Sequence, residues 1–235
     1  MENNIIPEPK KFFVAGDIRA NEQPGLICFH TLFVREHNRL CDEILRRETG
    51  LSDEEVFQHA RRWVGAILQA ITYEEWLPAL GISLTPYGGH DTEKNPGIMN
   101  IFSAAAFRLG HSMVNEQFIR LDQYGGLWSF GSVNLREAFF NTRIFYEEGG
   151  IDPFFRGMAV QMQQQLDNKI VGSLRNFLFG DPGKNGLDLA TINIMRARER
   201  GLPDYNTVRE NFGLARVSGF EEIAGPGTEA DALRA

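Results

Sequence analysis

The chain has 235 residues, of which 43% are hydrophobic, and a formal net charge of −7. This length suits one large domain or two small ones, and the acidic balance argues against nucleic acid or an anionic membrane surface as the main partner. Two cysteines are too few for a disulfide framework, and the longest apolar run, residues 63–71, is too short to span a bilayer.

Residues 1–15 contain two prolines and are predicted to be irregular, and they lack the apolar core of a secretion signal. Residues 16–25 form a polar turn in which Pro24 is placed as the first residue of a helix. That helix is predicted to run from Gly25 to about Glu48. Apolar residues and one histidine recur there at steps of three and four: Leu26, Phe29, Phe33, His37, Leu40 and Ile44.

A second helix is predicted to begin at Ser52. Ser52 and Glu55 have the spacing of a capping box, in which each side chain satisfies a free backbone N–H at the helix start. The helical pattern ends near residues 78–81, where a proline and a glycine occur. Residues 82–101 contain two prolines and three glycines and are predicted to form a loop.

Residues 102–122 are predicted to form one helix with a histidine near its middle. A serine cap and three alanines favour its start, and Phe107, His111 and Val114 share one face. Gly110 leaves bare backbone beside the histidine, where a large flat group could approach closely. From this pattern alone, a histidine on an apolar face is more often a hydrogen-bonded core residue than a metal ligand.

The rest of the chain is predicted to alternate short helices with loops. A hairpin is expected within residues 119–130, around a glycine pair, and residues from 213 onward offer little core. Helices are predicted at about 134–141, 152–165, 168–178, 187–199 and 204–211. Because no repeat, low-complexity segment or linker is apparent, we predict a mainly α domain over residues 16–214, followed by a tail over 215–235.

Three stretches together resemble the animal haem peroxidase superfamily, the group of myeloperoxidase and peroxidasin. They are AGDIRANEQPGLICFHTLFVREHNRL at 15–40, FRLGHSMVNEQFIRLD at 107–122 and GLDLATINIMRARERGLPDYNTVRENFGL at 186–214. They follow one another in the family's order, and the resemblance covers roughly residues 10–215. It implies a helical haem peroxidase domain with very little strand.

The resemblance implies that His111 is the proximal ligand of a haem iron. In such a site one imidazole nitrogen binds iron, and the other donates to an acceptor that fixes the ring. In the family that acceptor is an asparagine on a later helix, for which Asn168 is the best match. Arg108 matches the arginine that pairs with a haem propionate. Considered without the family, Asn168 fits a helix start and Arg108 a solvated helical arginine.

Near the N-terminus, Arg19 matches the distal catalytic arginine of the family. A fixed guanidinium there stabilises the negative charge that develops on the departing oxygen as the peroxide O–O bond breaks. Glu22 matches the glutamate that forms an ester with a haem methyl. Gln23 stands where myeloperoxidase has a methionine bonded to haem, and an amide cannot form that sulfonium link. Considered without the family, Arg19 and Glu22 fit a surface arginine and a carboxylate at a helix start.

The sequence departs from the family before Gly16. The family has a distal histidine there, the general base that moves the peroxide proton, followed by a calcium loop. The fifteen residues before Gly16 contain no histidine. We therefore expect a partial domain that lacks the distal base and the calcium site, and that an upstream segment would complete. The family's chain also continues beyond residue 235.

The resemblance implies a peroxidase that reduces hydrogen peroxide while it oxidises small donor molecules. A fatty-acid oxygenase of the same superfamily is one alternative, but those enzymes carry a radical-forming tyrosine where Arg108 stands here. A non-catalytic remnant or interaction module with the same helical core is the other alternative, which the missing distal histidine supports. The donor molecule and the localisation are left open.

Overall fold

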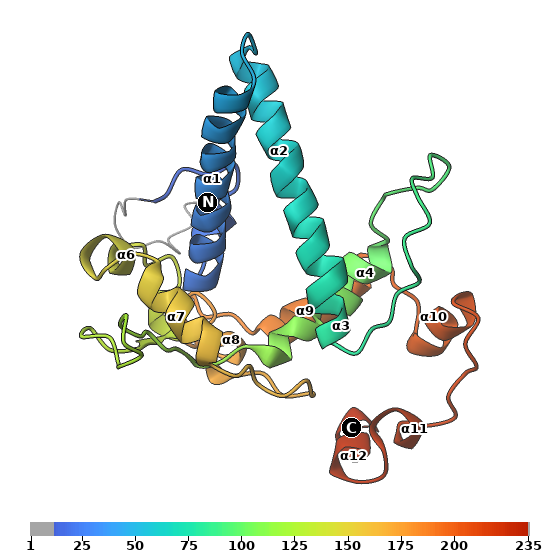
Figure 1. The fold of residues 1–235 in the computed structure, drawn as a ribbon. Coiled ribbons are helices and arrows are strands. Elements are labelled where there is room, and N and C mark those ends of the chain that lie inside the picture. The colour runs from blue at the N-terminus through green and yellow to red at the C-terminus, as the bar shows by residue number, and fades with distance from the viewer. Residues whose placement is uncertain (1–11, 235) are drawn as a thin grey trace.

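The computed structural model describes residues 12–234, in which helices are joined by irregular segments with very little strand (Figure 1). The predicted mainly α fold is therefore confirmed. The segment predicted to be irregular, residues 1–15, falls largely outside the described residues. Its described part, residues 12–15, forms neither helix nor strand.

Two long helices form a V-shaped hairpin that projects from the rest of the molecule (Figure 1). α1 spans Pro24–Arg47 and α2 spans Asp53–Ala70, as the sequence predicted. The capping box of α2 is formed, since the Ser52 N–H donates to the Glu55 carboxylate at 2.8 Å and the Ser52 hydroxyl accepts the Glu55 N–H at 3.3 Å. A small apolar cluster lies between the two helices: Leu40, Ile44, Val56 and Ala60.

The helical path continues beyond the end of α2 in a changed geometry. A π-helical turn, η2 at Ile71–Trp76, leads into α3 at Leu77–Ala79. Gly81 then adopts a φ of 78°, a left-handed value that stops a helix and that glycine adopts readily. The predicted end at residues 78–81 is confirmed. Residues 82–99, which follow, carry no helix or strand, as the sequence predicted for the loop.

The prediction of one helix over residues 102–122 is wrong. The segment contains a short α-helix, α4 at Asn100–Ala104, and a 3₁₀-helix, η3 at Ala106–Met113. The two are separated at Ala105, whose φ of −136° and ψ of −68° interrupt the helical path. The chain becomes extended at Val114, with a φ of −77° and a ψ of 135°.

Bonds to a distant segment explain why the helix does not continue. The Ile119 N–H donates to the Gln161 side chain at 3.1 Å, and that side chain donates in turn to the Gln117 carbonyl at 2.7 Å. The Leu121 N–H donates to the Pro153 carbonyl at 3.1 Å. In a continuous helix these backbone groups would form hydrogen bonds within the helix. Here they bond to Gln161 and Pro153 instead, so tertiary contacts override the local helical preference.

A hairpin surrounds the predicted glycine pair, but its strands lie just outside the predicted residues 119–130. β1, Gln117–Phe118, pairs antiparallel with β2, Val133–Asn134. The Asp122 carboxylate accepts the N–H groups of Tyr124 and Gly126 at 2.8 and 2.9 Å, which holds the turn closed at the predicted glycine pair. The two-residue strands are the only ones in the described part of the chain.

Short helices make up the remainder. The five that the sequence predicted are α5 at Leu135–Ala138, α7 at Asp152–Val160, α8 at Gly172–Arg175, α9 at Leu189–Glu199 and α10 at Tyr205–Asn211. Three were not predicted: α6 at Arg143–Glu147, α11 at Glu221–Ala224 and α12 at Thr228–Arg234. α5, α7 and α8 are shorter than expected.

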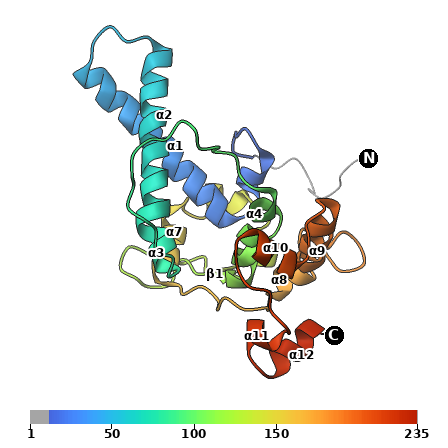
Figure 2. The same ribbon diagram turned by 90° about the vertical axis from the view of Figure 1, so that its right-hand side faces the viewer.

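The main core packs the start of α1 against α6 and α7. Ile27 and Cys28 of α1 meet Ile144, Phe145 and Phe154 there. Figures 1 and 2 both show α11 and α12 side by side at the margin of the molecule, away from this core. No helix among residues 12–234 has the length and hydropathy that a membrane crossing requires.

Candidate functional site

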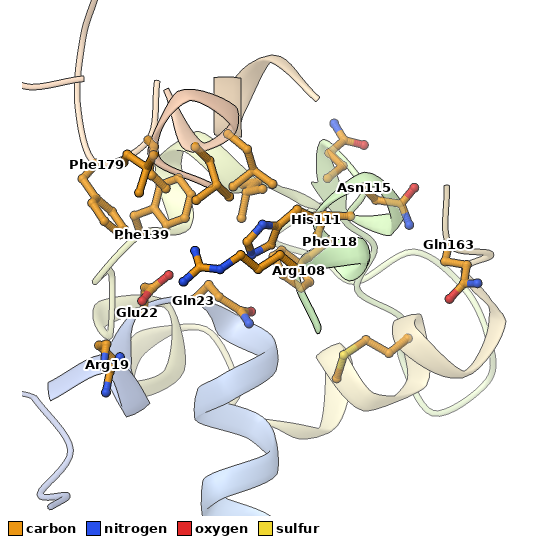
Figure 3. A pocket seen from close by; sticks show the side chains of 18 of the residues that line it. Arg19, Glu22, Gln23, Arg108, His111, Asn115, Phe118, Phe139, Gln163 and Phe179 are labelled. Carbon is orange, nitrogen blue, oxygen red and sulfur yellow. The ribbon is translucent and has the colours of Figure 1, made fainter. Parts of the chain in front are cut away.

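A cavity of about 880 Å³ lies where the segment before α1, η3, β1 and the helices α5, α7, α8 and α9 converge (Figure 3). Much of its lining is apolar and includes Phe118, Leu135, Phe139, Met158, Leu174 and Phe179. Arg19, Glu22, Gln23, Arg108 and His111 also line it, so the structure brings together the residues that the resemblance singled out near its first two stretches. A large, mainly apolar cavity with a few polar groups is the usual form of a cofactor site.

His111 enters this cavity from η3 as a half-buried side chain (Figure 3). Burial lowers the pKa of its imidazole, and the positive charge of Arg108 lowers that pKa further. The ring is therefore neutral at physiological pH, which is the form that binds a metal ion. A methyl group added at Gly110 would meet no atom within 4 Å, so the space beside the histidine is open.

The side chain that contacts His111 is Asn193 rather than the predicted Asn168. Asn193, on α9, places its Nδ2 2.9 Å from Nδ1 of His111. Asn168 is an exposed residue in a bend between α7 and α8, and it does not line the cavity. It does not start a helix either, because α8 begins four residues later at Gly172.

Asn193 also links His111 to Arg108. Nη1 of Arg108 donates to Oδ1 of Asn193 at 2.8 Å. Because arginine has no acceptor, Asn193 presents its oxygen to Arg108 and its NH₂ group to His111. In this arrangement Nδ1 of His111 accepts and Nε2 carries the proton. End-over-end rotation of the carboxamide would break the bond from Arg108, let Nδ1–H donate to the Asn193 oxygen, and leave the Nε2 lone pair free for a metal.

A third cavity arginine, Arg196, was not predicted. Arg196 follows Asn193 by one helical turn on α9, and both side chains reach the cavity region. Its buried Nε makes no hydrogen bond to any residue that the structure describes, and it forms an ion pair with the Glu199 carboxylate at 3.4 Å. The sequence could have indicated Asn193 and Arg196, because with Ile192 they fall at helical spacing on one side of the predicted helix.

The charged residues before α1 form the opposite side of the cavity. Arg19 lies in a 3₁₀ turn, η1 at Ile18–Asn21, and its exposed guanidinium pairs with Asp17 at 2.6 Å at the cavity edge (Figure 3). This hydrogen-bonded pairing lowers the pKa of Asp17 to about 2. Burial raises the pKa of the Glu22 carboxyl. Gln23 caps α1, because its Oε1 accepts the Gly25 N–H at 2.6 Å.

The model of the animal haem peroxidase family matches residues 1–235. The chain belongs to this family. Its structure matches the solved structure of Peroxidase A from Dictyostelium discoideum with a TM-score of 0.90 and 35% sequence identity. That match covers 100% of this chain and 45% of the Dictyostelium chain.

Curated relatives agree with this assignment. Peroxinectin A of Dictyostelium discoideum is 37% identical over 220 residues, which are 94% of this chain and 40% of the relative. Thyroid peroxidase of Sus scrofa is 39% identical over 223 residues, 90% of this chain and 24% of the relative. The human peroxidasin homolog is 39% identical over 229 residues, 94% of this chain and 15% of the relative. The chain therefore spans less than half of the length of these proteins.

The residues present fit the haem that the family implies. The cavity is large and mainly apolar, and a neutral histidine with an oriented ring enters it. Haem carries two carboxylates, and Arg108 and Arg196, whose guanidinium groups can pair with carboxylates, both line the cavity. Within residues 12–234, no cluster of three or more His, Cys, Asp or Glu side chains could hold a separate metal ion.

Proposed function

We propose that this chain is part of a haem peroxidase, which reduces hydrogen peroxide while it oxidises small donor molecules. The contact between Asn193 and His111 carries the proposal, because it orients a neutral histidine inside a large apolar cavity. Bound haem would supply the redox chemistry. His111 would hold the iron through Nε2, and Asn193 would fix the imidazole plane.

The other cavity residues would bind and orient the same group. Arg108 and Arg196 would pair with its two carboxylates. Glu22, half-buried in the lining, would supply the carboxylate for an ester link to a haem methyl, whose C–H bond would break with peroxide as the two-electron oxidant. The amide of Gln23 has no sulfur for a sulfonium link. Arg19, held by Asp17 at the cavity edge, would stabilise negative charge that develops on peroxide oxygen.

A non-catalytic module of the same fold is the second candidate. His111 is the one histidine in the described cavity lining, so this part of the chain supplies no second imidazole to take a proton from peroxide. A further segment of the protein, supplied upstream, would have to provide that base. The family's fatty-acid oxygenases are disfavoured because Arg108 replaces their radical-forming tyrosine.

Haemin titration tests the proposal. The protein should develop a sharp haem absorption band with one equivalent of haemin, and His111→Ala should abolish it. His30→Ala is the matched control, because His30 is exposed on α1 and does not line the cavity. If His111→Ala binds haemin with unchanged spectrum and affinity, the proposal is wrong. Adding peroxide and a donor to the complex then separates a peroxidase from a haem-binding module.

A further inference from the structure

Two phenylalanines beside the cavity have a backbone conformation that side chains normally avoid. Phe140 has a φ of 52° and Phe179 a φ of 66°, and every other residue with positive φ in the described chain is a glycine. For a bulky residue such values carry strain, which persists only where the surrounding structure enforces it. The strain at these two positions therefore indicates that the surrounding structure requires this backbone conformation.

Phe140 occupies a turn position that glycine usually fills. The Asn141 N–H donates to the Ala138 carbonyl at 3.1 Å, which closes a four-residue turn. Phe139 has a φ of −59° and a ψ of 121°, and the positive φ of Phe140 completes the geometry of a type II turn. Glycine would make this turn without steric strain, so the aromatic ring must contribute something that glycine cannot.

The turn contacts the segment that carries Glu22. The N–H of Phe140 donates to the main-chain carbonyl of Glu22 at 2.8 Å, across more than a hundred residues of chain. The Glu22 side chain lines the cavity, and burial raises the pKa of its carboxyl. The turn that Phe140 completes thus presents a backbone donor to the residue whose carboxylate faces the cavity.

The rings keep this turn in place. Phe140 packs against Phe179 with ring centroids 5.5 Å apart, and Phe179 packs edge-on against Phe139 at 5.2 Å. Phe139 and Phe179 both line the cavity on the side of Glu22 (Figure 3). The two strained residues therefore brace each other, and their contact joins the turn, the Glu22 segment and the cavity wall.

We propose that Phe140 is a positioning residue for Glu22: its left-handed turn holds the Glu22 backbone, and its ring locks that turn against Phe179. Glu22 consequently presents its carboxyl group to the cavity in one position rather than several. The inference rests on the proposed function only for the role of Glu22 toward haem. The positioning itself is a property of the protein that can be measured without haem.

Three variants separate positioning from packing. Phe140→Gly keeps the turn geometry and the N–H donor but removes the ring, whereas Phe140→Tyr keeps the ring. Phe155→Ala is the control for lost aromatic packing, because Phe155 contacts Phe29 at 5.3 Å and does not line the cavity. If Phe140 had a purely structural role, the pKa of Glu22 and the haem attached to it would change with the thermal stability of each variant.

The first measurement is a ¹³C NMR titration of the Glu22 carboxyl in the haem-free protein, with Glu22→Gln to assign the signal. Phe140→Gly should lower the Glu22 pKa towards the ordinary glutamate value, since a loosened carboxyl becomes hydrated, while Phe140→Tyr and Phe155→Ala should keep it. The groups that face this carboxyl, Arg19 and Asp17, are unchanged in all variants. An unchanged Glu22 pKa in Phe140→Gly, or an equal fall in Phe155→Ala, would refute the inference.

The second measurement is the fraction of haem that survives acid–organic extraction after incubation with haemin and peroxide. The fraction of haem that stays covalently attached should be at least threefold lower in Phe140→Gly than in Phe140→Tyr. If the wild-type protein retains no haem, or Glu22→Gln retains as much as wild type, the proposed role of Glu22 fails. The NMR titration still decides the positioning in that case, so the two failures are distinguishable.

Discussion

The guanidinium of Arg120, 1% exposed, donates from Nη1 to the Glu148 carboxylate at 2.6 Å and closes the base of the β1–β2 hairpin. Its other nitrogens donate to the main-chain carbonyls of Gly131 and Phe130 at 2.7 and 2.8 Å. The group also lies over the Phe154 ring, 5.3 Å from its centroid. A buried charge is tolerated here because every face of it has a partner.

Arg120→Ala should therefore destabilise the protein severely. It leaves Glu148 without its partner and two carbonyls unsatisfied, and breaking a buried ion pair costs about 3–5 kcal/mol. Arg143→Ala is the control, because Arg143 pairs with Glu147 on an exposed helix surface, where such pairs contribute about 0.3–0.5 kcal/mol. Chemical denaturation measures both values. Similar losses in the two variants would contradict the buried network.

Sequence reasoning succeeded where structure is determined locally. Pro24 and the Ser52–Glu55 capping box set the starts of α1 and α2, and periodic apolar residues set their lengths. It failed for residues 102–122, where the backbone bonds of Ile119 and Gln117 go to Gln161. Gln161 lies outside residues 102–122, so the periodicity of that segment could not reveal these bonds.

The site shows the same limit. The resemblance pointed to His111 and Arg108 because they lie in one contiguous motif, and both line the cavity. The side chain that contacts His111 is 82 residues away. Asn168 fitted the expectation of a later helical asparagine, yet it lies in a bend and is exposed. Asn193 lay in the third resembling stretch, and only the packing of α9 beside η3 distinguishes the two asparagines.

Two glycines in helices should respond oppositely to alanine. At Gly157 in α7, an added Cβ would lie 1.7 Å from the Ile119 carbonyl oxygen, so α7 and the β1 segment would be forced apart. Overpacking of this kind typically costs about 1–3 kcal/mol. At Gly65 in α2, no atom lies within 4 Å of the added Cβ.

Gly65→Ala should consequently stabilise the protein by up to about 1 kcal/mol through helix propensity alone. Thermal unfolding compares the two variants under identical conditions. Gly157→Ala should also weaken haemin binding, because β1 and α7 carry Phe118 and Met158 in the cavity wall. Equal melting temperatures for Gly157→Ala and wild type would show that the close approach is not enforced.

Asn193→Leu should weaken haemin binding, whereas Asn168→Leu should not. The first change leaves Nδ1 of His111 without its partner and frees the ring to rotate, and such losses typically reduce metal affinity about 10–100-fold. The second removes an exposed side chain outside the cavity. Spectroscopic titration with haemin measures both affinities. A matching loss in Asn168→Leu would restore that residue as the partner, and no loss in Asn193→Leu would remove Asn193 from the site.

The pH dependence follows from His111. Burial, and then the charge of Arg108, lower its pKa below the ordinary value, so the folded protein binds fewer protons here than the unfolded chain. The contribution of His111 therefore reduces stability as pH falls from about 6.5, the unfolded value, to the folded pKa, and it is constant above that window. His111→Gln should remove this part of the pH dependence.

Arg108→Gln isolates the second cause of the shift. Glutamine can still donate a hydrogen bond to Asn193 but carries no charge, so the pKa of His111 should rise while burial keeps it below the ordinary value. Arg196→Gln is the matched control, since it removes a cavity charge that does not act on His111. ¹H NMR titration of the imidazole ring measures all three proteins without haem. An unchanged His111 pKa in Arg108→Gln would show that burial alone keeps the histidine neutral. An equal rise in Arg196→Gln would show that cavity charge acts on His111 without the specific placement of Arg108.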